Sequence, residues 1–316
     1  MYNTTVSKIP VLVIGFNRPD LLNRLLIRLK ELGISELYVS LDGCRNSEDS
    51  LSCEQCFSTV MKFSNSFNLH FIRREYNLGC SLGVISAIDW FFSNVIFGAI
   101  IEDDCFPENN LFEFFEEFRL NKEELSGENI KLVTAHNPFD YKLVSPIIRS
   151  VLVHGWATHA ETWFKIRASY FSLNLPKFIN EIGEKRPIRE SIYWWANATR
   201  ARLGIIDTWD GILNDRVWRL GFKTLVPSKN LIINNGFGIE ATHTKDPNGS
   251  NLVNLSTEIL ETNGADQLLS LYYFKIKSRH IFSSLLRLAI DYSRSLKRKD
   301  FEKILIRDLN QREIVF

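Results

Sequence analysis

Short apolar segments alternate with helical patterns over the first 105 residues, and this alternation limits the fold more than any other feature of the chain. The apolar runs are rich in β-branched residues and cover residues 11–16, 37–41, 69–72 and 99–101. Strands and helices that alternate in this way form βαβ units, whose strands lie parallel in one sheet. The sequence therefore predicts an α/β fold.

The segment between the first two runs carries the clearest helix signal. Leucines recur there every three or four residues, at Leu21, Leu22, Leu25, Leu26, Leu29 and Leu32. Pro19 suits the first turn of a helix and Gly33 suits its C-terminal cap. We expect a helix over this stretch.

The rest of the chain mixes helical and extended patterns. We predict helices over 110–119, 161–170, 188–203 and 211–220, and strands over 131–135, 222–226 and 230–234. The last two strands are expected to return to the sheet, which would then be mixed and flanked by helices. Residues 264–308 interleave large apolar residues with Lys and Arg, and predict helices that either pack on the main domain or face a membrane surface.

Composition excludes some classes of partner. The 38 Lys and Arg residues nearly balance the 37 Asp and Glu residues, so no overall positive field would attract nucleic acid. The five cysteines are odd in number and predict reduced thiols. Cys53 and Cys56 are interpreted as neighbours on a helix rather than as a metal or redox pair. With no secretory signal at the N-terminus, we expect a soluble, cytoplasmic protein.

Three consecutive acids, Glu102, Asp103 and Asp104, follow the fourth apolar run. Ligands of open α/β sheets bind at the carboxyl ends of the strands, and adjacent carboxylates there repel one another unless a cation neutralises them. Mg²⁺ or Mn²⁺ suits such oxygen ligands and would bridge to phosphate. The alternative is a solvated acidic turn, which the position at a strand end disfavours.

Two further strand ends carry polar residues. Arg18 follows the first run, where it would either hold a phosphate or ribose or only cap a turn. Asp42 closes the second run and is placed to accept hydrogen bonds from a base or ribose, although Asp42-Gly43 alone is a common turn. The segment 73–83 contains glycines but has neither the Walker pattern nor GxGxxG, which argues against a P-loop ATPase or a dinucleotide enzyme.

Taken in order, these segments resemble the GT-A glycosyltransferases, in particular the N-acetylglucosaminyltransferase I branch and bacterial nucleotide-diphospho-sugar transferases. The resemblance covers about residues 9–245 and depends on the segments VLVIGFNR, SLDG, NLG, IEDD, NNGFG and ATHT. It implies a Rossmann-like nucleotide-diphospho-sugar transferase fold with a C-terminal helical extension. Residues 1–260 would be the catalytic domain, with a nucleotide-binding half (9–105) and an acceptor-binding half (106–260), and 261–316 the extension.

The resemblance also implies roles for single residues. Donor contacts would come from Arg18, Asp42, Asn77, Gly79 and Asp103, with Asp42 near the base and Asp103 at the sugar or ribose. Asp104 would be the direct metal ligand within the acidic element that begins at Glu102. His243 would complete the metal or diphosphate shell, or else be structural.

On the acceptor side, the resemblance places the catalytic base in the segment 207–211. Asp210 fits best and Asp207 is the alternative, although both could instead be helix caps. Trp156 would shape the sugar pocket. The implied activity is a metal-dependent, inverting sugar transfer from a nucleotide diphosphate donor, with UDP and UDP-GlcNAc favoured, to a saccharide or glycolipid acceptor in surface polysaccharide synthesis.

Two other functions remain open at this point. A sugar nucleotidyltransferase would use a similar sheet and similar acids, but it would need a glycine-rich basic loop directly after the first strand, and none is present. A non-catalytic sugar-binding relative is the second alternative. If the C-terminal basic helices face a membrane, the protein would be peripheral on the inner membrane surface, close to a lipid-linked acceptor.

Overall fold

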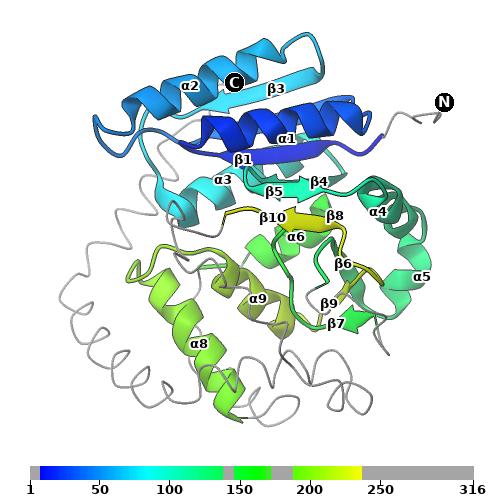
Figure 1. Cartoon of the computed structure of the whole chain (residues 1–316). Coiled ribbons are helices and arrows are strands. Elements are labelled where there is room, and N and C mark those ends of the chain that lie inside the picture. Colours follow the sequence, from blue (N-terminus) through cyan, green and yellow to red (C-terminus); the bar gives the residue numbers. More distant parts are fainter. Residues whose placement is uncertain (1–7, 138–145, 169, 172–187, 237–316) are drawn as a thin grey trace.

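The computed structural model describes residues 8–137, 146–168, 170–171 and 188–236 of the 316 residues (Figure 1). Within these ranges a mixed eight-stranded sheet has helices on both faces, and a separate two-stranded ribbon accompanies it. The predicted α/β, Rossmann-like class is confirmed.

The bounds of the elements are as follows. The strands are β1 (Val11–Gly15), β2 (Glu36–Leu41), β3 (Asn68–Arg73), β4 (Phe97–Glu102), β5 (Cys105–Pro107), β6 (Ile130–Thr134), β7 (Ile147–Ile148), β8 (Trp156–His159), β9 (Lys223–Leu225) and β10 (Ile232–Asn234). The helices are α1 (Pro19–Glu31), α2 (Ser50–Lys62), α3 (Gly79–Asn94), α4 (Leu111–Leu120), α5 (Lys122–Gly127), α6 (Ala160–Arg167), α8 (Ile188–Arg202) and α9 (Asp210–Arg219).

The order of strands across the sheet is β3-β2-β1-β4-β8-β6-β9-β7. The first four strands in the chain pair in parallel, as the βαβ pattern predicts. Strand β8 runs antiparallel between β4 and β6, and β7 is antiparallel to β9. The chain passes from β1 to β2 on one side and returns to β4 on the other, so the switch point of the sheet lies between β1 and β4.

Helix α1 shows how local sequence determines an element. Pro19 begins the helix, and its buried leucines form the stripe that the sequence predicts. Gly33 has a φ of 72°, a left-handed conformation that favours glycine. The N–H groups of Gly33 and Ile34 donate to the carbonyl oxygens of Lys30 and Leu29, which completes the capping motif expected from the glycine.

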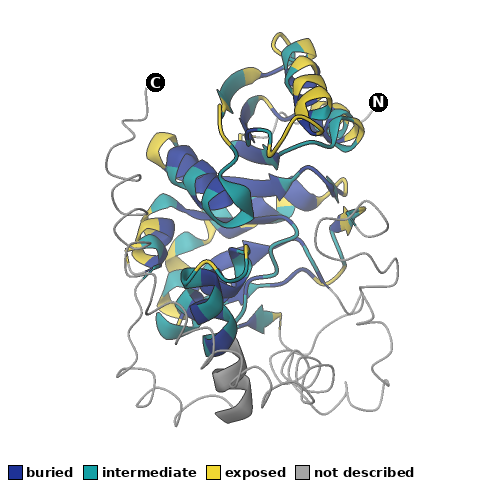
Figure 2. Cartoon of the chain, turned by 90° about the vertical axis from the view of Figure 1, so that its left-hand side faces the viewer, coloured by how far each residue is buried: buried dark blue, intermediate teal, exposed yellow. Residues whose placement is uncertain are grey.

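The sheet separates two apolar cores, which appear as buried residues on both faces in Figure 2. Val11 and Val13 belong to the core shared with α1, α2 and α4, while Leu12 belongs to the core shared with α3, α6 and α9. The alternation follows from the two-residue period of a strand. Each such side chain that is fully buried contributes about 1.5–3 kcal/mol to the free energy of folding.

One prediction about the later chain needs correction. Strand β10 pairs with β5 rather than with the main sheet, because the chain from Glu102 turns away to form its own antiparallel ribbon. Strand β8, at Trp156–His159, was not predicted. Residues 261–316, including the predicted helices over 264–308, lie outside the described residues. Among the helices that the structure describes, none combines the length and hydrophobicity that a membrane span requires.

Candidate functional site

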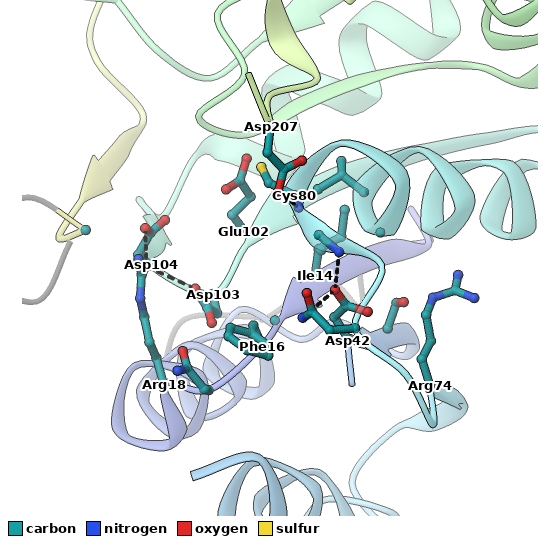
Figure 3. A pocket seen from close by; sticks show the side chains of 18 of the residues that line it. Ile14, Phe16, Arg18, Asp42, Arg74, Cys80, Glu102, Asp103, Asp104 and Asp207 are labelled. Carbon is teal, nitrogen blue, oxygen red and sulfur yellow. Dashed lines mark hydrogen bonds and ion pairs between the residues drawn. The ribbon is translucent and has the colours of Figure 1, made fainter. Parts of the chain in front are cut away.

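A pocket of about 320 Å³ lies at the carboxyl ends of β1, β2 and β4 (Figure 3). Residues 9–105 supply most of its wall, through Phe16, Asn17, Arg18, Asp42, Arg45, Arg74, Asn77, Gly79, Cys80, Glu102, Asp103 and Asp104. His154, Asp207, Asn234 and Gly236 complete the wall from the other half. The pocket therefore occupies the switch point, where ligands of open α/β sheets bind.

Arg18 and the acids after β4 meet across the switch point. The Arg18 Nη1 atom lies 2.6 Å from Asp104 Oδ2 and 3.5 Å from Asp103 Oδ1 (Figure 3). Parallel pairing of β1 with β4 places the two strand ends side by side, since Ile14 is opposite Glu102. A strand-end cation and strand-end acids that are 85 and 86 positions apart in the chain thus form one charged cluster.

Arg18 alone does not compensate the three neighbouring carboxyl groups after β4. Burial raises the pKa of Glu102 to about 8, and the charges of Asp104 and Asp103 add to the effect. Burial, with the charge of Asp104, also raises the pKa of Asp103 to about 7, although Arg18 opposes the shift. A cation that entered the pocket would therefore be attracted to these carboxylates.

Asp42 lies on the pocket wall, and its oxygens already have donors. The backbone N–H groups of Gly43, Leu78 and Gly79 donate to its carboxylate at 3.0–3.1 Å. The side-chain amide of Asn77 donates to the same carboxylate at 3.1 Å. Burial raises the pKa of Asp42, and these hydrogen bonds oppose the rise. Asp42 thus holds the loop after β3 against the end of β2.

Asp207 reaches the same loop from the other half of the chain. Its two carboxylate oxygens accept hydrogen bonds from the backbone N–H groups of Cys80 at 2.8 Å and Ser81 at 2.7 Å. Gly79 has a φ of 77°, and a Cβ atom there would lie 2.7 Å from Asp207 Oδ2. Only glycine fits that position without a shift.

The remaining predicted residues fall in three different places. Asp210 is the first residue of α9 and accepts a hydrogen bond from the Thr208 hydroxyl; it does not line the pocket, although its charge raises the pKa of Glu102. Trp156, predicted to shape the sugar pocket, does not line this pocket, and its side chain is fully buried beside Trp163 and Trp209. His243 lies outside the described residues.

His154 is a pocket residue that the sequence reasoning did not identify. Burial lowers its pKa, against the charges of Asp104 and Asp210. Its ring packs edge-on against His136, with 5.1 Å between centroids. Gly155, which follows it, has a φ of 73° and turns the chain into β8. The only signal in the sequence was the polar character of the segment 154–159.

Arg45 and Arg74 add positive charge on the β2 side of the pocket and were also not identified. The Arg45 guanidinium lies over the Phe16 ring, 5.0 Å from its centroid, and pairs with Asp49 at 2.6 Å. Arg74 donates to the Ser86 hydroxyl at 2.7 Å. Both follow strand ends, β2 and β3, which is the signal that could have revealed them.

A complete protein-built metal cage is not found in the described part of the chain, where no three His, Cys, Asp or Glu side chains converge on one point. Mg²⁺ at phosphate sites is usually held by one or two carboxylates, with substrate phosphates and waters completing the shell. Asp104 fits that requirement. In this structure the positive group next to its carboxylate is the guanidinium of Arg18.

No protein-family model matches the sequence, and a search of curated proteins gives no match. The chain is similar to a solved structure assigned as a glucose-1-phosphate thymidylyltransferase from Bacillus anthracis, at 10% identity and a TM-score of 0.38, over 79% of this chain and 98% of that one. Mouse xyloside xylosyltransferase 1 is similar at 8% identity and a TM-score of 0.37, over 69% of this chain and 84% of that one.

TarS of S. aureus (residues 1–349) is similar at 11% identity and a TM-score of 0.34, over 66% of this chain and 69% of that one. Because these scores and identities are low, we infer function from the residues that line the pocket.

Proposed function

We propose that the chain is a glycosyltransferase that moves a sugar from a nucleotide diphosphate donor to a hydroxyl group of a saccharide or glycolipid acceptor, with inversion at the anomeric carbon. The observation that carries the proposal is the meeting of Arg18 with Asp103 and Asp104 at the switch point between β1 and β4. A guanidinium beside a cation-attracting acid cluster suits the diphosphate of such a donor.

The donor would lie along the carboxyl ends of the parallel strands. Its phosphates would face Arg18 and Asp104, and its nucleoside would extend toward Asp42, Asn77 and the arginines near β2 and β3. Uridine is the favoured base and UDP-GlcNAc the favoured donor, on the strength of the sequence resemblance. Gly79 would let the loop backbone approach the donor closely.

We propose that Mn²⁺ or Mg²⁺ is required, held by Asp104 together with the donor diphosphate, with Glu102 adding negative charge nearby. When bound, such an ion would stabilise the charge of the departing nucleoside diphosphate. Arg18 would then be free to bind a phosphate oxygen, because a charge-assisted hydrogen bond to phosphate is as favourable as one to a carboxylate. His243 remains a proposed additional ligand.

The attacking hydroxyl group needs a base on the acceptor side. We propose Asp210, whose charge acts on Glu102 and His154 and which therefore lies near the pocket. When an acceptor binds, the hydrogen bond from the Thr208 hydroxyl to Asp210 would have to break, or Asp210 would have to accept a second hydrogen bond from the acceptor. Removal of such a base lowers turnover by about 10²- to 10⁴-fold.

A donor screen tests the proposal. The purified full chain is titrated with UDP, GDP and CMP, each with and without Mn²⁺, while thermal stability is followed. We expect UDP with Mn²⁺ to stabilise the protein most, because a ligand that binds only the folded state raises its stability. Stabilisation by GDP alone would overturn the uridine assignment, and no effect of any nucleotide would overturn the function.

A sugar nucleotidyltransferase is the second candidate, because it would also bind a nucleotide and a metal ion at such a pocket. The segment after β1, Phe16-Asn17-Arg18-Pro19, has no glycine and only one basic residue, which disfavours binding of a nucleoside triphosphate there. Pyrophosphate release from UTP and a sugar 1-phosphate would support this alternative. Release of UDP from a UDP-sugar would support the glycosyltransferase.

We further propose that the acceptor is lipid-linked and lies at the inner membrane surface, where a cytoplasmic enzyme of surface polysaccharide synthesis would meet it. The support is the basic and apolar pattern of residues 264–308. Basic residues near an anionic membrane surface contribute about 1 kcal/mol each to binding.

A further inference from the structure

We propose that Asp207 is a positioning residue, not a base: it pins the first turn of α3 to the acceptor-binding half and so fixes the loop 77–81 that forms one wall of the donor pocket. The link to the donor rests on the proposed function. The attachment of this turn by Asp207 is argued from hydrogen bonds that do not depend on the proposed function.

The first turn of α3 is capped by side chains from elsewhere in the chain. Leu78, at the N-cap position, makes no side-chain cap. The first N–H groups of any helix have no partner within the helix. The Cys80 and Ser81 N–H groups are satisfied by the two oxygens of Asp207, at 2.8 and 2.7 Å, from 127 and 126 positions further along the chain.

The loop is held from its other side by Asp42, at the end of β2. Asp42 accepts from the N–H groups of Leu78 and Gly79, the two positions directly before those that Asp207 holds. Four successive backbone N–H groups, at 78–81, are thus shared between one carboxylate of each half of the chain. Figure 3 shows Asp42 and Asp207 on opposite sides of this turn.

The segment that carries Asp207 is anchored in the apolar core. Trp209, two residues further on, is 3% exposed and stacks against Trp156, with 6.2 Å between ring centroids and 29° between ring planes. The Tyr170 hydroxyl donates to the backbone carbonyl of Trp209 at 2.5 Å. The segment that carries Asp207 is therefore held by a buried residue two positions away.

These contacts leave Asp207 poorly suited to accept a proton from an acceptor. Both of its oxygens already accept hydrogen bonds from backbone N–H groups. If Asp207 moved away to act as a base, the N–H groups of Cys80 and Ser81 would lose their acceptors. Loss of the pin would free the loop, and the donor would then have to order it on binding. Fixing the backbone of one residue costs about 1–2 kcal/mol, which corresponds to about tenfold in affinity.

The test compares Asp207→Ala and Asp207→Asn with the wild-type full chain. Glu161→Ala is the matched control, because it removes an exposed first-turn acid from α6, outside the pocket. Amide hydrogen exchange is measured at Cys80 and Ser81, and binding of UDP with Mn²⁺ is measured by calorimetry without acceptor. Turnover is then separated into kcat and KM for the donor.

In Asp207→Ala, we expect the amide hydrogens of Cys80 and Ser81 to exchange rapidly and UDP to bind about tenfold more weakly. The loss in turnover should appear mainly as a higher KM for the donor. Asp207→Asn keeps one oxygen acceptor and should lie between the alanine variant and wild type, which covers the case that the alanine variant does not fold. Glu161→Ala should leave both amides protected.

Three results would overturn the inference. Unchanged hydrogen exchange at both amides in Asp207→Ala would show that Asp207 does not hold the first turn of α3. Unchanged UDP affinity with a kcat loss of about 10²-fold or more would show a base. Tighter UDP affinity would show that Asp207 competes with the donor. If wild-type protein bound no nucleotide, the proposed function would fail while the exchange measurement still decided the role of Asp207.

Discussion

Glu102→Gln should stabilise the metal-free protein at alkaline pH. Burial and the charges of Asp104 and Asp103 raise the pKa of Glu102 from 4.5 to about 8. Between these pH values the folded protein keeps a proton that the unfolded chain has lost, so stability falls as the pH rises through this window. Glutamine has nearly the same shape and never ionises, and the Glu102 carboxyl makes no hydrogen bond that the substitution would break in the described part of the chain.

The size of the effect follows from the window. At about 1.4 kcal/mol for each pH unit between 4.5 and about 8, the upper limit is about 5 kcal/mol at pH 9. The pKa of Asp103 is also raised, to about 7, so the free energy of unfolding of both proteins falls further as the pH rises toward 7. Burial lowers the pKa of His136 and His159 to about 4, which acts in the opposite sense below pH 6.5. The difference between the two proteins isolates Glu102.

Urea unfolding at pH 5, 7 and 9 in metal-free buffer measures this difference. We expect the two proteins to be nearly equal at pH 5, and the variant to be more stable by about 2–5 kcal/mol at pH 9. Glu161→Gln is the control, because Glu161 is exposed, and its pKa is lowered by a hydrogen bond from Lys122, so no gain at pH 9 should follow. Equal stabilities of wild type and Glu102→Gln at pH 9 would refute the reasoning.

Three further perturbations test other parts of the molecule. Asp215→Ala should lower the free energy of unfolding by about 3–5 kcal/mol, measured in urea, because it leaves Arg202 and Arg219 buried without their shared carboxylate. Arg18→Gln should weaken UDP binding by about tenfold or more in calorimetry, since hydrogen bonds to charged groups contribute about 1.5–3 kcal/mol; unchanged affinity would contradict the diphosphate assignment. Co-sedimentation with anionic liposomes should weaken, with soluble-acceptor turnover retained, when Ser replaces Arg294, Lys297, Arg298 and Lys299.

The fold of residues 9–105 could be predicted because its signals are local. Each strand from β1 to β4 is a short apolar run, and the helix between β1 and β2 shows its leucine stripe, its proline and its glycine cap within 15 residues of sequence. Parallel pairing then follows from the βαβ rule, which places the ends of β1, β2 and β4 at one edge. Arg18, Asp42 and the acids from Glu102 therefore line one pocket.

The fold of the chain after residue 105 was harder to predict because its contacts are not local. Strand β8 has only four residues and lies between β4 and β6, so its pairing partners are distant in the chain. Its burial on both faces of the sheet explains why Trp156 belongs to the core. The ribbon of β5 with β10 joins residues more than a hundred positions apart, and no local pattern marks that pairing.

Acidic residues look alike in a sequence, yet the structure separates them by what their oxygens contact. The carboxylates of Asp42 and Asp207 accept hydrogen bonds from backbone N–H groups and thereby hold one loop in place. Glu102 and Asp103, in contrast, have raised pKa values because burial and neighbouring acids outweigh the donors around them. A carboxylate that lacks compensation gains most from an added cation, whereas one with its donors in place gains little. Metal or substrate charge should therefore act at the end of β4, while the loop 77–81 supplies the shape of the pocket.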